Sequence, residues 1–167
     1  MNLLFDINGY LKPGAPLGLA FSEIERSFVT PYSNSETRVG LFEAFREYNL
    51  DLLEILGPTD VLQWIDGSFI SRKQNPGDLD MVSFIDSVSV DQHENQLKLL
   101  REKWKKHSFS IDSYFVKQYN KSHRYYPRTV SDKLYWNQLF SSIRIGGATK
   151  LNKKGFVEFK LNHYELN

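Results

Sequence analysis

The sequence lacks several features that would assign the protein to a common class. None of its 167 residues is cysteine, which excludes disulfides, thiolate metal ligands and cysteine nucleophiles. No apolar run approaches the ~20 residues that a membrane-spanning helix needs. The N-terminal stretch also lacks the basic segment of a secretory signal. We therefore expect a cytoplasmic protein that does not enter a membrane.

Three frequent kinds of site are missing as well. No Gly-x-Gly-x-x-Gly turn is present, so a doubly wound dinucleotide fold is not predicted. Ser68 has no accompanying Ser/His/Asp arrangement, which argues against a serine nucleophile. The histidines show no mutual spacing typical of a metal site or a catalytic dyad, and we expect surface positions for His93, His107, His123 and His163.

The composition is nevertheless that of a folded protein, with 41% hydrophobic and 14% aromatic residues. A chain of this length fits one domain, residues 1–167, in which residues 1–34 form an N-terminal arm packed on the main body. The order of predicted elements is helix, strand, strand, helix, strand, helix, strand. This order indicates an α+β (α/β) fold in which a small mixed sheet is flanked by helices, covered on one side. The predicted ranges are 35–56, 61–65, 79–85, 90–106, 109–116, 130–145 and 156–161.

Apolar spacing gives the core-facing positions of the helices. Among the residues that we expect to face the core are Val39, Leu99, Leu134 and Leu139. Arg38 and Arg46, two turns apart in the first long helix, are predicted to be exposed.

Charge is distributed unevenly along the chain. Residues 117–160 contain ten Lys or Arg and two acidic residues, which gives about +8 against about −7 for the remainder. A basic segment of this kind suits a polyanionic substrate. Within it, the stretch Lys117–Trp136 mixes tyrosines with cations, as single-strand nucleic-acid platforms do. A solvated surface loop explains the same composition, and both interpretations remain open.

The central motif is the stretch Trp64–Asp86. A predicted strand leads into Gly67-Ser68, where backbone N–H groups and a hydroxyl could contact a phosphate. The next strand opens with Asp78-Leu79-Asp80, and strand alternation places the two carboxylates on one face. Such a pair of like charges favours a bound cation.

A third carboxylate lies on a later strand. Asp112 lies in the middle of the predicted strand 109–116, between Ile111 and Ser113, where an isolated Asp is unfavourable. If this strand neighbours the one that contains Asp78 and Asp80, three carboxylates converge. Carboxylate oxygens suit Mg²⁺ or Mn²⁺. Asp66 and Asp86, in contrast, are interpreted as turn or edge residues.

The joint pattern resembles the nucleotidyltransferase superfamily typified by DNA polymerase β, in which a strand, Gly-Ser, a spacer and Asp-x-Asp precede a third Asp. The residues of the motif are similar to those of a small bacterial subfamily of minimal nucleotidyltransferases. Further segments that share this similarity are Leu11–Gly14, the helix around Arg38, and Trp136, Phe140, Arg144, Lys154 and Gly155.

The resemblance implies an enzyme that transfers a nucleotide from an NTP to an acceptor hydroxyl on RNA, such as tRNA, or on protein. Asp78, Asp80 and Asp112 would bind Mg²⁺ or Mn²⁺ and carry the catalysis. The nucleotide would be bound by Gly67, Ser68, Lys73, Arg144 and Lys154. Relatives of this kind act in toxin–antitoxin pairs or phage defence, which implies an operon partner protein.

The motif departs from the commonest form at one point. A glycine that often follows Gly-Ser is replaced by Arg72-Lys73, which could place a cation on the γ-phosphate instead. An alternative from another class is an inactive nucleotidyltransferase-like module that binds nucleotide, RNA or a partner protein. That alternative predicts that Asp112 stays apart from the other two carboxylates, or that Arg144 or Lys154 fills the metal site.

Overall fold

The computed structural model describes residues 5–145, 147–151 and 153–166, apart from the side chains of residues 144 and 145. The helices are α1 (Phe21–Phe28), α2 (Arg38–Leu56), α3 (Ser87–Gln92), α4 (Glu94–Lys105) and α5 (Tyr126–Phe140), with short 3₁₀ turns η1 (Thr30–Tyr32) and η2 (Ser68–Ile70). The strands are β1 (Leu17–Gly18), β2 (Val61–Asp66), β3 (Asp78–Asp86), β4 (Ser110–Gln118), β5 (Ile143–Ile145), β6 (Ala148–Lys150) and β7 (Val157–Leu161).

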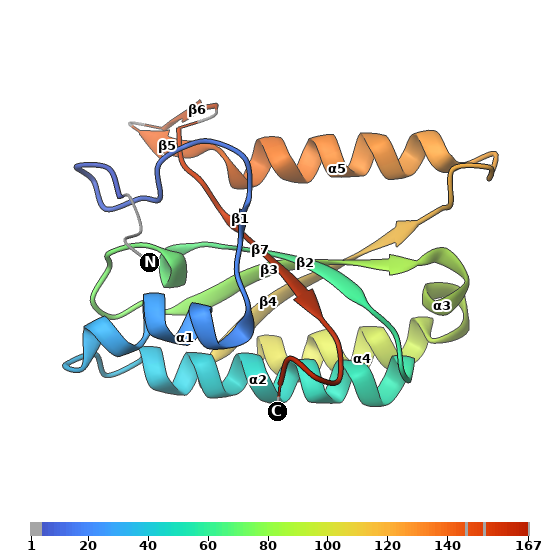
Figure 1. Cartoon of the computed structure of the whole chain (residues 1–167), viewed down its shortest axis with the longest axis horizontal. Helices are drawn as coiled ribbons and strands as arrows, with labels where there is room; N and C mark the ends of the chain where they lie inside the picture. Colours follow the sequence, from blue (N-terminus) through green and yellow to red (C-terminus); the bar gives the residue numbers. More distant parts are fainter. Residues whose placement is uncertain (1–4, 146, 152, 167) are drawn as a thin grey trace.

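One five-stranded mixed sheet forms the centre of the molecule, in the order β1-β7-β2-β3-β4 (Figure 1). β2 is antiparallel to both β3 and β7, whereas β3 and β4 are parallel. A parallel pair needs a crossover connection, and α3 with α4 supplies it. β5 and β6 form a separate hairpin. The predicted α+β class is therefore confirmed.

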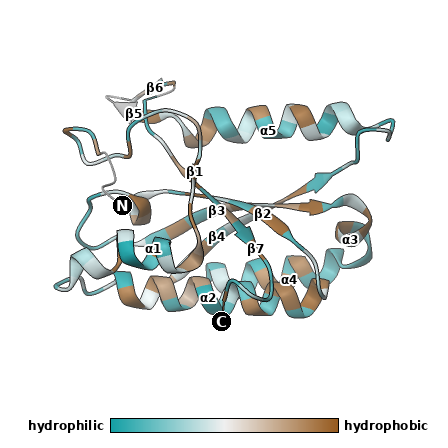
Figure 2. Cartoon of the chain, viewed as in Figure 1, coloured by the Kyte–Doolittle hydropathy of each residue, from teal (hydrophilic) through white to brown (hydrophobic). Residues whose placement is uncertain are grey.

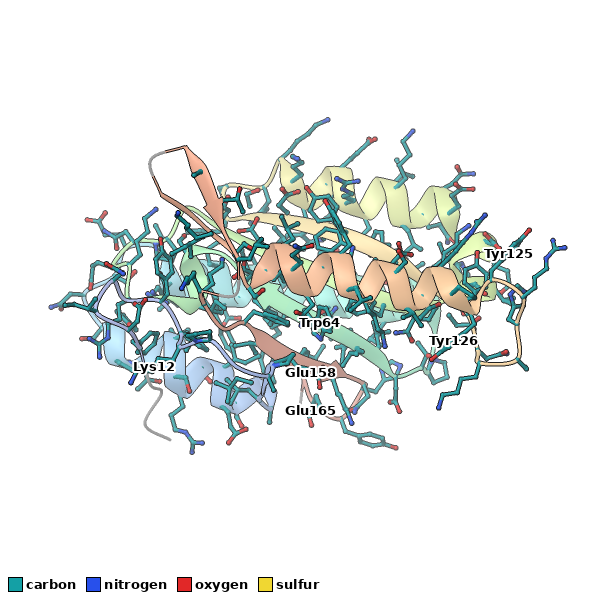
Figure 3. All side chains as sticks on the ribbon, turned by 90° about the horizontal axis from the view of Figure 1, so that it is seen from above. Lys12, Trp64, Tyr125, Tyr126, Glu158 and Glu165 are labelled. Atoms are coloured by element: carbon teal, nitrogen blue, oxygen red, sulfur yellow. The ribbon has the colours of Figure 1, made fainter. Side chains whose placement is uncertain are left out.

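Helices cover both faces of the sheet, so the expectation of cover on one side was wrong. Figure 1 shows α1, α2 and α4 on one face and α5 on the other. Alternation along β4 explains the arrangement, since Tyr114 packs on Trp136 of α5 with ring centroids 4.9 Å apart. Its neighbour Ser113 is fully buried on the opposite face. The same α5 face carries Trp64, whose Nε1 donates to Glu158 Oε2 at 2.9 Å (Figure 3).

The face that α2 covers holds most of the core. Gln63 of β2 donates to Asn49 Oδ1 at 2.8 Å and to Ser83 Oγ at 3.1 Å. Phe45 of α2 packs edge-on against Phe159 of β7, with ring centroids 5.8 Å apart. A buried polar network that is hydrogen-bonded in this way fixes the position of the helix on the sheet.

The helices differ from their predicted ranges at three points. The first long helix begins at Arg38 rather than at residue 35. The predicted helix 90–106 is divided at His93 into α3 and α4, and the carboxylate of Asp86 caps α3 by accepting from the backbone N–H of Val88 at 2.9 Å. The predicted helix 130–145 begins earlier, at Tyr126, with Pro127 in its first turn, and ends at Phe140. Proline suits that position because its missing N–H would be unpaired there.

Four residues that were expected to face the core are exposed. Only one stripe of a helix can pack on a sheet, and these residues lie beside that stripe. α5 carries hydrophobic residues that are not all turned to the sheet (Figure 2). The exposed fractions are 60% for Val39, 65% for Leu99, 66% for Leu134 and 46% for Leu139.

The described part of the N-terminal arm packs on the sheet and on the loop that follows η2. β1 pairs in parallel with β7. The backbone N–H of Arg72 donates to Gly9 O at 2.8 Å, and that of Gly155 donates to Leu11 O at 2.7 Å. In the part of the chain that the structure describes, no helix combines the length and apolar character needed to cross a bilayer.

Candidate functional site

Three aspartates from adjacent strands form a row on the α5 face of the sheet. Asp66, the last residue of β2, pairs with Asp80 of β3, and Asp80 pairs in register with Asp112 of β4. Register partners on neighbouring strands are about 5 Å apart and point to the same face. The sheet therefore places the three carboxylates side by side.

Asp78 lies one pleat before Asp80, at the exposed start of β3, in register with Ser110. It shares the face of the row but stands outside it. The strands thus bring together Asp80 and Asp112 of the predicted set, with Asp78 at its edge. They add Asp66, which the sequence had indicated as a turn or edge residue.

The row is electrostatically unfavourable for Asp80. Burial is the largest cause of a raised pKa of its carboxyl, which is about 6 against an ordinary 3.8. The negative charges of Asp78, Asp66 and Asp112 raise this pKa as well, and the charge of Lys154 opposes them. A carboxylate with these neighbours gains from any cation that binds next to it.

Lys154 supplies one such cation. Its Nζ lies 2.7 Å from Oδ1 and 2.6 Å from Oδ2 of Asp66, and the two side chains are only 13% and 10% exposed. Burial raises the pKa of Asp66, whereas the charge and hydrogen bonds of Lys154 lower it. Lys154 was predicted to bind nucleotide, and in the structure it neutralises a carboxylate of the row.

Asp112 has partners of its own. Lys105 Nζ lies 3.4 Å from Oδ1, and the Tyr114 hydroxyl donates to Oδ2 at 3.3 Å. Across the described ranges, no three Asp, Glu or His side chains are placed together closely enough to hold a metal ion. With Asp66 turned to Lys154, the remaining oxygen donors of Asp80 and Asp112 are of the type that suits Mg²⁺ or Mn²⁺. The metal site stays a prediction.

Gly67 allows the Gly-Ser turn to lie against the row. It adopts φ +84° and ψ −166°, a conformation almost confined to glycine. A Cβ at this position would come within 2.1 Å of Asp80 Oδ2. Ser68 follows it as the half-buried first residue of η2. The turn therefore keeps its backbone in contact with the carboxylates.

The other residues that were predicted to bind nucleotide are placed differently. Lys73 is exposed in the loop between η2 and β3 and does not line the pocket described below. The side chain of Arg144 lies outside the described residues.

A buried arginine holds the loop in place. Arg38, at the start of α2, is 0% exposed and donates four hydrogen bonds of 2.6 to 2.7 Å to backbone carbonyls. The acceptors are the carbonyl oxygens of Phe28, Phe69, Ser71 and Lys73. The prediction of an exposed Arg38 was wrong, because the curvature of this loop offers carbonyls to the helix rather than to water. Arg46 is exposed, as predicted.

A pocket of about 640 Å³ opens from the carboxylate row toward the C-terminal half of α5. Its walls combine acidic, basic and aromatic groups: Asp66, Asp80, Tyr114, Tyr135, Trp136, Leu139, Phe140, Ser142, Ile143, Thr149 and Lys154. Aromatic faces beside charged groups suit a ligand that has a flat ring at one end and charge at the other.

Comparison with known proteins gives a family but no named relative. No curated protein and no solved structure matches the chain. Residues 3–160 match the model of a family of unknown function, DUF6932, which covers the whole sheet except the last residue of β7. The chain therefore belongs to the DUF6932 family.

Proposed function

We propose that this protein is a metal-dependent nucleotidyltransferase that transfers a nucleotide from an NTP to an acceptor hydroxyl in the cytoplasm. The observation that carries the proposal is the register of Asp80 with Asp112 beside the Gly67 turn. The resemblance of the central motif to the nucleotidyltransferase superfamily points to the same chemistry.

The reaction would form one bond and break another at the α-phosphorus. The acceptor oxygen joins the α-phosphorus, the bond from that phosphorus to the bridging oxygen breaks, and pyrophosphate leaves with that bonding pair. The hydroxyl proton passes to solvent. Transfer of this type depends on positioning and charge neutralisation more than on covalent catalysis by the protein.

Each part of the site has a role in this scheme. Asp78, Asp80 and Asp112 would hold Mg²⁺ or Mn²⁺, which would neutralise triphosphate charge when bound. The Gly67-Ser68 turn would contact the phosphates. The pocket wall at Trp136 would accommodate the base, because the lining of the pocket places aromatic surface beside the charged groups.

A second candidate function is binding without catalysis. The observation that favours it is the ion pair between Lys154 and Asp66, which already neutralises one carboxylate of the row. Such a module would bind nucleotide, RNA or a partner protein, with Lys154 in place of one cation.

One experiment separates the two functions. Purified protein is incubated with each α-labelled NTP, Mn²⁺ and cell extract, and label in RNA and protein is measured. We expect transfer by the wild type and a loss of about 100-fold or more in Asp80→Asn and Asp112→Asn. Asp60→Asn is the matched control, because Asp60 is exposed next to the opposite end of β2, and it should retain the activity.

Calorimetric binding of NTP with Mn²⁺, measured on the same proteins, completes the comparison. Binding without transfer by the wild type would favour the second candidate. Neither binding nor transfer for any NTP would overturn the enzyme and the nucleotide-binding form of the second candidate.

A further inference from the structure

An aromatic and basic cluster lies at the end of α5 remote from the carboxylates. We call it the Tyr125 cluster, and it consists of Tyr119, His123, Arg124, Tyr125 and Arg128. Figure 3 shows Tyr125 and Tyr126 at this end of the helix, and Figure 1 shows the β5–β6 hairpin at the other. The cluster occupies the loop between β4 and the first turn of α5.

The rings of the cluster are ordered rather than loosely solvated. Tyr119 stacks on His123 with centroids 4.8 Å apart and an interplanar angle of 23°. Tyr125 meets Tyr119 edge-on at 5.6 Å. Backbone bonds fix the loop, since Tyr119 N donates to Thr129 Oγ1 at 2.8 Å and Tyr126 N donates to His123 O at 2.9 Å. The loop is therefore a preformed surface.

Two guanidinium groups flank one ring of this surface. The Arg124 and Arg128 guanidinium carbons lie 4.5 and 4.4 Å from the ring centroid of Tyr125. Both arginines are exposed, and among the described residues neither forms an ion pair with a carboxylate. Lys117, in contrast, is paired with Asp91. Cations that are held by an aromatic ring but lack a carboxylate are available to an anionic partner.

The distance from the cluster to the pocket favours an extended partner. α5 has 15 residues, so its ends are about 22 Å apart at about 1.5 Å per residue. Tyr135, which is 59% exposed, lies at the pocket end of this path. A strand with stacked bases, which rises about 3.4 Å per nucleotide along its axis, would place about six nucleotides on this path.

We propose that the Tyr125 cluster binds single-stranded nucleic acid, whose phosphates contact Arg124 and Arg128 and whose terminal hydroxyl reaches the pocket. This inference rests on the proposed function, for which it names the acceptor as a nucleic-acid strand. Two interactions bind single strands without sequence preference, namely base stacking on aromatic rings and contact of arginines with phosphates. In the Tyr125 cluster the two tyrosines are half-buried and His123 is exposed. A duplex presents no free base faces and would gain only the contact with phosphates.

The test is fluorescence anisotropy with a labelled single-stranded RNA of about ten uridines, a length within the range of single-strand sites. Arg124→Ala/Arg128→Ala should weaken binding about 10-fold or more and reduce the slope of log K against log salt by about 1.4. Arg124→Lys/Arg128→Lys should weaken it less, because charge remains while planar stacking is lost. Thermal unfolding confirms that each variant is folded.

Lys98→Ala/Lys106→Ala is the matched control, since it removes two exposed positive charges beside the other face of the sheet. It should bind RNA as the wild type does. Equal RNA binding by the two alanine double variants would overturn the inference. A labelled duplex that binds as tightly as the single strand would overturn it too.

NTP binding with Mn²⁺, measured in parallel, separates this inference from the proposed function. Arg124→Ala/Arg128→Ala should retain NTP binding, because both arginines lie outside the pocket. Unchanged RNA binding together with intact NTP binding would reject the Tyr125 cluster alone. If the wild type binds RNA but does not bind any NTP, the proposed function alone is rejected.

Discussion

Gly67 and Asp80 are so close that a β-carbon on Gly67 would lie 2.1 Å from Asp80 Oδ2. Gly67→Ala should therefore lower the free energy of unfolding by about 3 kcal/mol, the combined cost of a clash and of a glycine-type backbone. Thermal unfolding measures the change. Gly57→Ala is the matched control, because Gly57 has nearly the same dihedral angles, φ +74° and ψ −165°, and no described atom lies within 4 Å of the position that a methyl group would take there.

Gly57→Ala should cost only about 1 kcal/mol, since the backbone strain remains and the clash does not. Equal losses in the two variants would show that contact with Asp80 contributes nothing. The difference between them measures how firmly the Asp80 carboxylate is held against the turn.

Asp80→Asn should stabilise the protein at neutral pH. The folded-state pKa of about 6 lies above the ordinary 3.8, so ionised Asp80 opposes folding. Protonated Asp80 does not oppose folding, so its contribution to the free energy of unfolding is fully present below about pH 4. That contribution is lost as the pH rises through about 6 and the carboxyl ionises in the folded state. The variant should gain up to about 3 kcal/mol over the wild type at neutral pH. Urea unfolding across this pH range measures the gain.

The gain from Asp80→Asn should shrink at about pH 4, where the wild-type carboxyl is protonated in the folded state. A variant that is less stable than the wild type at neutral pH would contradict the electrostatic account. So would a gain that does not depend on pH.

Lys154→Met should leave the Asp66 carboxylate buried without its ion-pair partner. Removing one member of such a pair costs about 3 kcal/mol at neutral pH. The loss should be smaller at low pH, because protonation of Asp66 removes the unpaired charge. Chemical unfolding of the variant at two pH values gives both quantities.

Asp66→Asn/Lys154→Met tests whether the cost of Lys154→Met comes from the charge. This double variant has no buried charge at either position and should recover most of the stability that Lys154→Met loses. If the double variant is as unstable as Lys154→Met, the loss comes from the packing of the lysine stem and not from the charge.

Arg38→Lys should loosen the loop between η2 and β3. A lysine has three donors on one nitrogen and cannot reach four carbonyls placed around a planar guanidinium. We expect a loss of about 3 kcal/mol, because buried carbonyls are left without donors. Limited proteolysis should cut near Lys73 faster than in the wild type. Arg46→Lys is the control, since Arg46 is exposed and donates to a single carbonyl, Leu166 O, among the described residues.

Much of the fold and half of the site follow from the alternation of side chains between the two faces of a strand. Alternation along β3 places Asp78 and Asp80 on one face of the strand, because strand geometry has period two. Whether Asp112 joins that face depends on the register between β3 and β4, which long-range pairing determines. Asp66 was missed because the strand was predicted to end one residue early. A carboxylate directly before Gly-Ser was the available signal.

Arg38 shows a second limit of prediction from sequence. It lies four residues before Phe42 and seven before Phe45, on the stripe that faces the core, whereas a charged side chain is assumed to avoid such a stripe. Its partners are backbone carbonyls from two other segments. No local pattern encodes those contacts, because they exist only after the loop has folded against α2.

The position of β7 has a consequence for the order of folding. This strand comes late in the chain yet lies between β1 and β2, so β1 lacks its partner strand until residues 157–161 are synthesised. Lys154 lies just before β7 and reaches Asp66 only when that strand is inserted. A nascent chain would hold Asp66 without its ion-pair partner until then, and contacts so distant in sequence form slowly. The site is thus completed by one of the last steps of folding, which ties its assembly to the closure of the whole sheet.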